Sequence, residues 1–294
     1  MRRAAFQLAA AMAITGVNVP VAKVLAESLP VAAIVFLRCL VALLLLLPLA
    51  RLVEPGAARP RGLLVANLAA QAAFGTLLYN AALLAGLRLT SALEAGLVLA
   101  SMPAMVAFGA FLLLGERPGA AQWLGACLAV LGIALLNTAP IGWDRGGPAA
   151  SLAGNALVFV AVCGETVYAL LSRRSAGAIG IFTGTLWMQF FSALMLAPFA
   201  LPALAAVGRA AMTPRLGLLL VFHGATASVL QLLLWYSGMR KMPASRAGIF
   251  TIFLPAAAAA TAIVWLGERA TAAHGAGFVL MAISVWLATR GAGR

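Results

Sequence analysis

Charged side chains are scarce in this chain, and acidic ones are scarcer than basic ones. Of the 294 residues, Asp and Glu contribute 7 and Lys and Arg contribute 20, so charged residues make up 9% against 64% hydrophobic residues. An ordinary water-soluble domain is about a quarter charged and about half apolar. The composition therefore excludes a water-soluble domain.

Cysteine and histidine are also rare, with three cysteines and two histidines in the whole chain. Cys39, Cys127 and Cys163 fall within long apolar runs, and none is close to another in sequence. Disulfide frameworks and zinc sites depend on closely spaced pairs, so we expect neither, and we expect no metal or other cofactor. The sequence also lacks a Walker loop and a Ser, His and Asp set in a polar segment. We therefore expect neither ATP hydrolysis nor another enzymatic activity.

Long apolar runs occupy almost the whole chain. A helix needs about 20 such residues to cross a hydrocarbon layer of about 30 Å, and the short connections between the runs leave no room for a soluble catalytic domain. We predict an all-α integral membrane protein with ten transmembrane helices, near residues 4–25, 30–52, 62–87, 91–114, 119–138, 150–172, 178–201, 215–238, 244–266 and 271–290.

The first residues, MRRAAFQLAAAMAITG, also have the pattern of a signal peptide. Two arginines precede an apolar stretch, and Ala11-Met12-Ala13 is a candidate cleavage triplet. Cleavage would leave an odd number of spans and would break the repeat described below. We therefore expect the first helix to be retained.

The basic residues are distributed unevenly between the two sides of the predicted helices. With the N-terminus in the cytoplasm, 13 of the 20 Lys and Arg residues fall on the cytoplasmic side, 6 fall on the outer side, and Arg38 falls within a span. Cytoplasmic loops of membrane proteins carry such an excess. We therefore predict that both termini are cytoplasmic, and we assign the net charge of +13 to membrane topology rather than to nucleic-acid binding.

The sequence contains a gapless internal repeat. Residues 92–135 align with residues 244–287, and the match includes the turn Gly115-Glu116-Arg117 against Gly267-Glu268-Arg269. A five-helix unit therefore occurs twice, and we place the two copies at residues 1–140 and 150–294.

An odd number of helices per copy inverts the second copy in the membrane relative to the first. Inverted repeats support alternating access to a site near the midplane of the bilayer. The alternative is that the duplication builds a large bundle without transport.

These features resemble the EamA branch of the drug/metabolite transporter superfamily, whose members are ten-helix transporters built from two such halves. The resemblance covers essentially the whole chain and looks greatest to the bacterial aromatic amino acid exporters. In the first helix, Thr15 stands where many members have Trp. The resemblance rests on the LGER turns at 114–117 and 266–269, the prolines upstream of them, GACLAVLGIALL at Gly125–Leu136, and Arg38 in FLRCL.

Several polar side chains fall inside the predicted spans, where an ionisable group costs a few kcal/mol unless it faces a cavity or a partner helix. Glu165 and Tyr168 are three residues apart and share one helix face, and Glu165 is the best candidate for a proton-linked or amine-binding role. His223 and Gln231 share a stripe of the eighth span, where a histidine could relay a proton. Interhelical hydrogen bonding is the alternative for each of these groups.

We predict a substrate site with a polar part and an apolar part. The polar end of the substrate should contact Asn18, Gln71, Glu165, His223 and Gln231, and the apolar part should be shaped by Tyr79, Tyr168, Trp187 and Trp235. For the aromatic residues, packing or interfacial anchoring is the alternative.

A second set of residues is predicted to be structural or to act in gating: Arg38, Glu94, Pro103, Arg246 and Pro255. Arg38 lies roughly 12 Å into the second helix, at 1.5 Å per residue. We expect it to bond helix-end carbonyls or a carboxylate. Glu94 and Arg246 occupy matching positions of the two copies.

The sequence thus predicts a secondary transporter that exports amino acids, aromatic ones preferred, across a bacterial inner membrane by alternating access. The expected partners are a small-molecule substrate and the lipid bilayer, and a monomer would suffice. The amino acid preference is an implication of the resemblance. The alternatives are a broad-specificity drug or metabolite exporter and, less favoured, a membrane enzyme or receptor. An enzyme would need clustered catalytic residues at one membrane face, and a receptor usually has a sizeable soluble segment.

Overall fold

The computed structural model describes residues 2–57, 59–114, 119–136, 147–175, 177–239, 250 and 252–290. Within these ranges the chain is helical and contains no β-strand. The helices are α1 (Arg2–Ser28), α2 (Val31–Val53), α3 (Leu63–Gln71), the π-helical η1 (Ala72–Leu78), α4 (Tyr79–Leu87), α5 (Ala92–Leu99), α6 (Met102–Leu114), α7 (Ala120–Leu136), α8 (Gly147–Ser175), α9 (Ile181–Ala211), α10 (Pro214–Ala225), the π-helical η3 (Thr226–Leu230), α11 (Gln231–Met239), α13 (Phe253–Leu266) and α14 (Ala272–Arg290).

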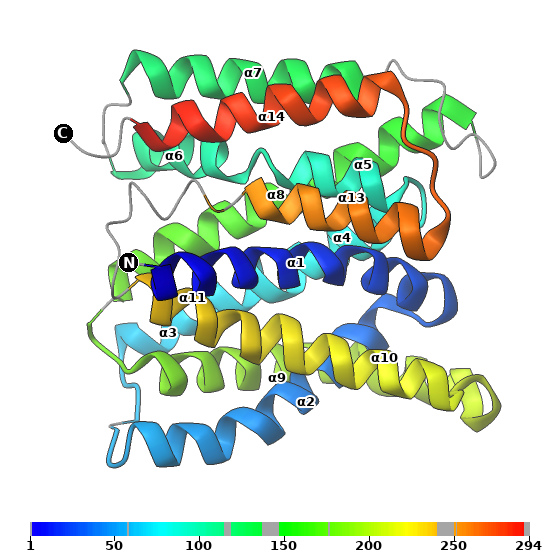
Figure 1. Ribbon diagram of the computed structural model, residues 1–294. Coiled ribbons are helices and arrows are strands. Elements are labelled where there is room, and N and C mark those ends of the chain that lie inside the picture. The colour runs from blue at the N-terminus through cyan, green and yellow to red at the C-terminus, as the bar shows by residue number, and fades with distance from the viewer. Residues whose placement is uncertain are drawn as a thin grey trace.

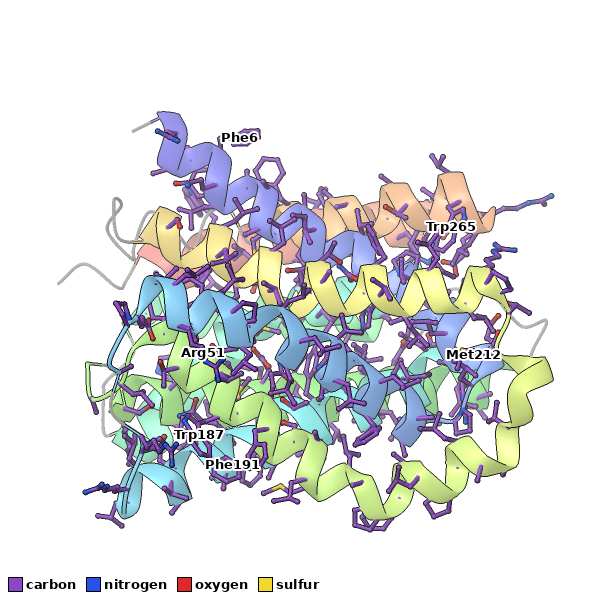
Figure 2. All side chains as sticks on the ribbon, turned by 90° about the horizontal axis from the view of Figure 1, so that it is seen from below. Phe6, Arg51, Trp187, Phe191, Met212 and Trp265 are labelled. Carbon is purple, nitrogen blue, oxygen red and sulfur yellow. The ribbon has the colours of Figure 1, made fainter. Side chains whose placement is uncertain are left out.

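Six described helices are long and apolar enough to span a bilayer, namely Arg3–Ser28, Val31–Val53, Leu63–Leu87, Ala149–Ser172, Ile181–Val207 and Pro214–Trp235. Three shorter apolar helices accompany them, at Ala92–Val106, Phe253–Leu266 and Ala272–Leu287. Large apolar side chains such as Phe6, Leu44 and Val264 are exposed on the outside of the bundle, and Figure 2 shows Phe6 pointing away from it. Hydrocarbon tails accommodate such a surface, whereas water does not. The prediction of an all-helical, multi-pass membrane protein is therefore confirmed, while the count of ten spans stays a prediction.

The repeated sequence features lie at helix ends. Pro103 is the second residue of α6 and Pro255 the third of α13, where the backbone N–H that proline lacks would have no helical partner anyway. Gly267, the glycine of the second Gly-Glu-Arg turn, ends α13 with φ = 69°. The next N–H, from Glu268, donates to the carbonyl of Ala262 at 3.2 Å and closes the helix end. The turn therefore requires glycine at this position. The first copy of the turn, including Glu116, lies outside the described residues.

Two of the predicted spans contain a π-helical segment. Residues 62–87 are divided into α3, η1 and α4, and residues 215–238 into α10, η3 and α11. The π-helical segments thus occupy the third and the eighth predicted spans, which are corresponding helices of the two copies. Such segments widen a helix locally and are frequent at functional sites.

The two copies pack against each other in a reciprocal way. Helix α1 packs on α13 and α11, while α8 packs on α6 and α4. Helix α2 packs on α9, and α7 packs on α14. If each helix of the first copy is exchanged for its counterpart in the second, the same set of contacts results. An approximate two-fold axis between the copies would have this effect.

Glycine permits the closest of these approaches. A Cβ atom at Gly16 would collide with the carbonyl oxygen of Leu254 and would lie 2.8 Å from the backbone nitrogen of Ala258. Helices α1 and α13 therefore pack backbone to backbone at this point.

The two ends of the bundle are distinguished by the positions of the chain ends and of the connection between α13 and α14. The described chain begins and ends at one end of the bundle, while the connection between α13 and α14 lies at the other (Figure 1). We call this second end the distal end.

Candidate functional site

A cavity of about 370 Å³ lies between helices of the two copies. From the first copy, α1, α2, η1, α4 and α6 contribute to its wall, and from the second, α8, α9, α10, η3, α11 and α13. Small-molecule sites commonly enclose roughly 300–1,000 Å³. The cavity is therefore large enough for one small metabolite.

Both π-helical segments face this cavity. Gly75 and Thr76 of η1 line it from one side, and Ala227 and Ser228 of η3 line it from the other. The local widening of the two corresponding helices thus coincides with the cavity wall.

Seven of the nine predicted substrate contacts lie in the cavity wall: Asn18, Tyr79, Glu165, Tyr168, His223, Gln231 and Trp235. Two of them meet across the interface of the copies, because His223 Nδ1 lies 2.7 Å from Asn18 Oδ1. Asn18 Nδ2 donates to the carbonyl of Ile14 at 2.8 Å and to Thr226 Oγ1 at 3.0 Å, which fixes the orientation of the amide. His223 Nδ1 therefore donates to Asn18, and the pair joins α1 to α10.

The other two predicted contacts, Gln71 and Trp187, do not line the cavity in the structure. Gln71 Nε2 donates to Asn67 Oδ1 at 2.5 Å and to Ser175 Oγ at 3.0 Å, and so ties α3 to the end of α8. Gln71 thus forms hydrogen bonds within α3 and between helices instead of lining the cavity. Trp187 packs against Phe190 and Phe191, with ring centroids 5.5 and 5.9 Å apart, and Figure 2 shows its side chain beside that of Phe191.

Two wall residues have a buried polar atom without a hydrogen-bond partner, and neither was predicted as a substrate contact. Arg38 was expected to bond carbonyls or a carboxylate, but it lines the cavity, is 8% exposed, and its Nε has no hydrogen-bond partner. Gln189 was not singled out at all, although an amide inside the apolar run WMQFF was a signal for it. It lines the cavity, is 3% exposed, and its Oε1 has no partner.

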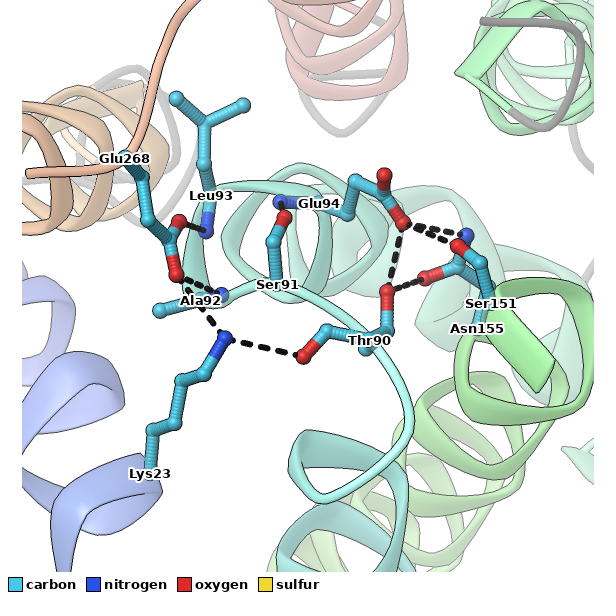
Figure 3. Close-up of polar contacts among 9 residues, drawn as sticks. All are labelled: Lys23, Thr90, Ser91, Ala92, Leu93, Glu94, Ser151, Asn155 and Glu268. Atoms are coloured by element: carbon cyan, nitrogen blue, oxygen red, sulfur yellow. Dashed lines mark hydrogen bonds and ion pairs between the residues drawn. The ribbon is translucent and has the colours of Figure 1, made fainter. Parts of the chain in front are cut away.

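The distal end is held by an ion pair between the two copies. Lys23 Nζ lies 2.9 Å from Glu268 Oε1 and donates to the carbonyl of Thr90 at 3.1 Å. The Glu268 carboxylate accepts from the backbone N–H groups of Ala92 and Leu93, both at 3.0 Å. These two groups begin α5, where the helix dipole favours a negative charge. Figure 3 shows how this carboxylate joins α1, α5 and the connection between α13 and α14.

Glu94 extends these contacts to α8. It is buried, and its Oε2 accepts from Thr90 Oγ1, Ser151 Oγ and Asn155 Nδ2 at 2.5, 2.7 and 3.0 Å (Figure 3). We call the connected set Lys23, Thr90, Glu94, Ser151, Asn155 and Glu268 the distal network. The structural or gating role of Glu94 stays a prediction, and Arg246, its counterpart in the repeat, lies outside the described residues.

At the opposite end, Glu54 ties α2 to α9. Its carboxylate accepts from the backbone N–H groups of Phe182 and Thr183 at 3.1 and 2.9 Å and from Thr183 Oγ1 at 2.7 Å. Burial acts to raise the pKa of Glu54, but the hydrogen bonds from Thr183 and Phe182 outweigh it and lower the pKa below its ordinary value. The charged carboxylate therefore caps the start of α9.

Metal binding has no visible site in the part of the chain that the structure describes. There, no group of three His, Cys, Asp or Glu side chains comes together as metal ligands would.

A family model, a curated protein and a solved structure resemble this chain. The model of the "EamA-like transporter family" matches the chain twice, at residues 2–138 and 152–290. The "Uncharacterized transporter YetK" of Bacillus subtilis (strain 168) is 33% identical over 261 residues, which cover 89% of this chain and 79% of that protein. A solved structure described as "Crystal structure of protein" shares the fold, with a TM-score of 0.64 and 18% identity over 97% of this chain and 96% of that one. The chain therefore belongs to the EamA-like transporter family, within the drug/metabolite transporter superfamily.

Proposed function

We propose that the chain is a secondary transporter that exports amino acids, with aromatic amino acids preferred, across a bacterial inner membrane by alternating access. The observation that carries this proposal is the cavity of about 370 Å³ between the two copies. Its wall combines aromatic and thioether side chains, such as Tyr79, Trp235 and Met188, with a few polar groups. An amino acid with an apolar side chain matches such a wall, because it has one polar end and one apolar end.

The proposed mechanism uses two inverted five-helix halves, at residues 1–140 and 150–294. The reciprocal packing of the halves supports an arrangement in which either half can play the role of the other. With the termini in the cytoplasm, as the basic residues favour, the distal end faces the outside.

The distal network lies at one end of the cavity. On α1, the wall residues run from Met12 to Ala22, and Lys23 of the network follows directly. On α9, the wall residues Thr185 and Gln189 lie near the start of the helix, toward the end that carries the termini. The structure thus fits a state that is closed at the outer side, and release to the outside would require the distal network to separate.

Counterflow in liposomes tests the substrate. Purified protein would be reconstituted into liposomes loaded with unlabelled phenylalanine, tyrosine or tryptophan, and uptake of the labelled amino acid would be followed. We expect faster uptake than into protein-free liposomes. Replacing Trp235 of the cavity wall by Ala should weaken the apparent affinity, whereas Trp265→Ala, on the outer surface (Figure 2), should not.

Two results would contradict this proposal in part or in whole. If no amino acid is exchanged, amino acid transport is wrong. If chemically unrelated drugs are exchanged as well as amino acids, the chain is a broad-specificity exporter.

Labelling tests the inverted arrangement. Single cysteines at Glu116 and Arg269, one in each copy of the Gly-Glu-Arg turn, would be treated with a membrane-impermeant maleimide in right-side-out and inside-out vesicles. We expect the two positions to react from opposite sides of the membrane. Reaction from the same side would exclude inverted halves and, with them, the proposed mechanism.

A further inference from the structure

We infer that Arg38 and Glu165 act together as a selector for zwitterions, with Arg38 binding the carboxylate of the substrate and Glu165, assisted by Gln189, binding its ammonium group. This inference rests on the proposed function and specifies how the same cavity recognises its substrate. It makes the presence of both charges, rather than the apolar side chain, the condition for tight binding.

Arg38 supplies a positive charge that forms no ion pair within 4.0 Å among the described residues. It lies in α2, lines the cavity and is 8% exposed, and its Nε has no hydrogen-bond partner. Buried polar groups are nearly always hydrogen-bonded, and a buried charge without a counter-ion is costly. A carboxylate in the cavity would satisfy the guanidinium, which is shaped to bind carboxylates with two parallel hydrogen bonds.

The acidic residues near the helix ends are already used. Glu54, Glu94 and Glu268 accept hydrogen bonds at the two ends of the bundle, which leaves Glu165 as the acidic residue in the cavity wall. Within the described ranges, the ion pair that the structure contains joins Lys23 to Glu268. Arg38 and Glu165 thus line one cavity without being paired to each other.

Gln189 adds a second acceptor to the cavity wall, and it comes from the second copy, as Glu165 does. Its Oε1 is buried and has no hydrogen-bond partner, and its helix, α9, belongs to the second copy, as does α8 with Glu165. An ammonium group has three N–H donors and no acceptor, so it would satisfy both the carboxylate and the amide oxygen. An α-amino acid would therefore bridge the copies, with its carboxylate on the first and its ammonium group on the second.

The experiment removes one charge at a time from the ligand and from the protein. Three probes share a phenyl group: L-phenylalanine, phenethylamine, which lacks the carboxylate, and 3-phenylpropionate, which lacks the ammonium group. Each would be tested as an inhibitor of labelled phenylalanine counterflow and as a stabiliser of the purified protein in thermal unfolding. For the unaltered protein, we expect either single-charge probe to bind at least about tenfold more weakly than phenylalanine, because each charge-assisted hydrogen bond contributes more than 1.4 kcal/mol.

The variants should separate the two charges. Arg38→Gln should weaken phenylalanine and 3-phenylpropionate at least about tenfold and leave phenethylamine unchanged. Glu165→Gln should weaken phenylalanine and phenethylamine and leave 3-phenylpropionate unchanged. Matched controls are Arg51→Gln, on the exposed end of α2, and Glu27→Gln, on the exposed end of α1, which should alter none of the three.

Comparison of the probes within one variant does not depend on how much of that variant is folded. The selector is wrong if the unaltered protein binds all three probes equally, or if Arg38→Gln weakens all three by the same factor. If Arg38→Gln cannot be purified, the relative affinities of the three probes for the unaltered protein decide whether the selector exists.

The thermal measurement keeps this inference separate from the proposed function. Exchange of phenylalanine together with equal binding of the three probes would overturn the selector alone. Selective stabilisation by phenylalanine without any exchange would support the selector and overturn transport.

Discussion

Removal of the charge on Glu268 should open the distal end of the bundle. The Lys23 and Glu268 side chains are 11% and 16% exposed, and their charged atoms are 2.9 Å apart. Glu268 also accepts the first two backbone hydrogen bonds of α5. Substitution of Glu268 by Gln keeps the shape of the side chain but leaves Lys23 without its counter-ion.

The size of the effect follows from this partial burial. Removing one partner of a fully buried ion pair costs about 3–5 kcal/mol, whereas an exposed pair contributes less than about 1 kcal/mol. We expect about 2 kcal/mol for Glu268→Gln and a similar cost for Lys23→Met, between these limits. The double variant contains no unpaired charge, so it should cost less than the sum of the two single variants. If the lost stability belongs to the closed distal end, the open population should rise about thirtyfold.

Two measurements check this prediction. Thermal unfolding of the single and double variants gives the coupling energy of the pair. Labelling of a cysteine at Ala22, in a background without Cys39, Cys127 and Cys163, reports access to the cavity from the distal side. We expect labelling up to about thirtyfold faster in Glu268→Gln, and no change in the control Glu27→Gln.

Two results would refute the reasoning. If the single effects add to within about 0.5 kcal/mol, Lys23 and Glu268 do not interact. If the pair is coupled but labelling from the distal side is unchanged, the pair stabilises the fold without closing the cavity.

Three further predictions concern packing and helix ends. Gly16→Ala should lower the free energy of unfolding by about 1–3 kcal/mol, since its Cβ would collide with the Leu254 carbonyl. The control Gly217→Ala, whose Cβ would meet nothing within 4 Å, should be neutral or stabilising. Equal melting temperatures of the two variants would contradict the close approach at Gly16. Glu54→Gln should destabilise the protein at neutral pH. Because the pKa of Glu54 is lowered, the stabilisation is present above its ordinary pKa of 4.5 and is lost as the pH falls through the folded-state pKa. Melting curves of the variant and the unaltered protein should therefore converge on acidification. A difference that stays constant with pH would show that the Glu54 charge is not the cause. Ser284→Ala should cost about 1 kcal/mol, because the buried Oγ donates to the Gly125 carbonyl at 2.7 Å and joins α14 to α7; an unchanged thermal unfolding midpoint would show that this bond adds nothing to stability.

Much of the cavity wall could be predicted from polar residues within apolar runs. Asn18, Glu165 and His223 were found because an isolated polar group in a membrane helix must face a partner or a cavity, and the structure places all three in the wall. The same rule cannot tell a cavity from a partner helix. Gln71 therefore proved to be bonded to Asn67 and Ser175 instead.

Arg38 and Gln189 show a different limit of prediction from sequence. Arg38 was recognised as an intramembrane charge, but its lack of a hydrogen-bond partner at Nε depends on every neighbouring helix. The prediction assumed that the protein would satisfy the charge itself. Gln189 lies between aromatic residues in the sequence. Whether its side chain faces lipid or the cavity is decided only when α9 packs against α2 and η1.

The sequence alone determined that this protein is a bundle of membrane helices with a duplicated origin. In hydrocarbon, each backbone polar group must be satisfied within its own segment, so long apolar runs can only be helices, and the matching turns at Glu116 and Glu268 reveal the repeat. The tertiary structure alone decided which helix faces meet. Rotation and pairing of helices depend on contacts between residues far apart in sequence, such as Gly16 with Leu254 and Lys23 with Glu268. For this reason only the assembled bundle shows the ion pair at the distal end and an arginine in the cavity wall whose Nε has no hydrogen-bond partner.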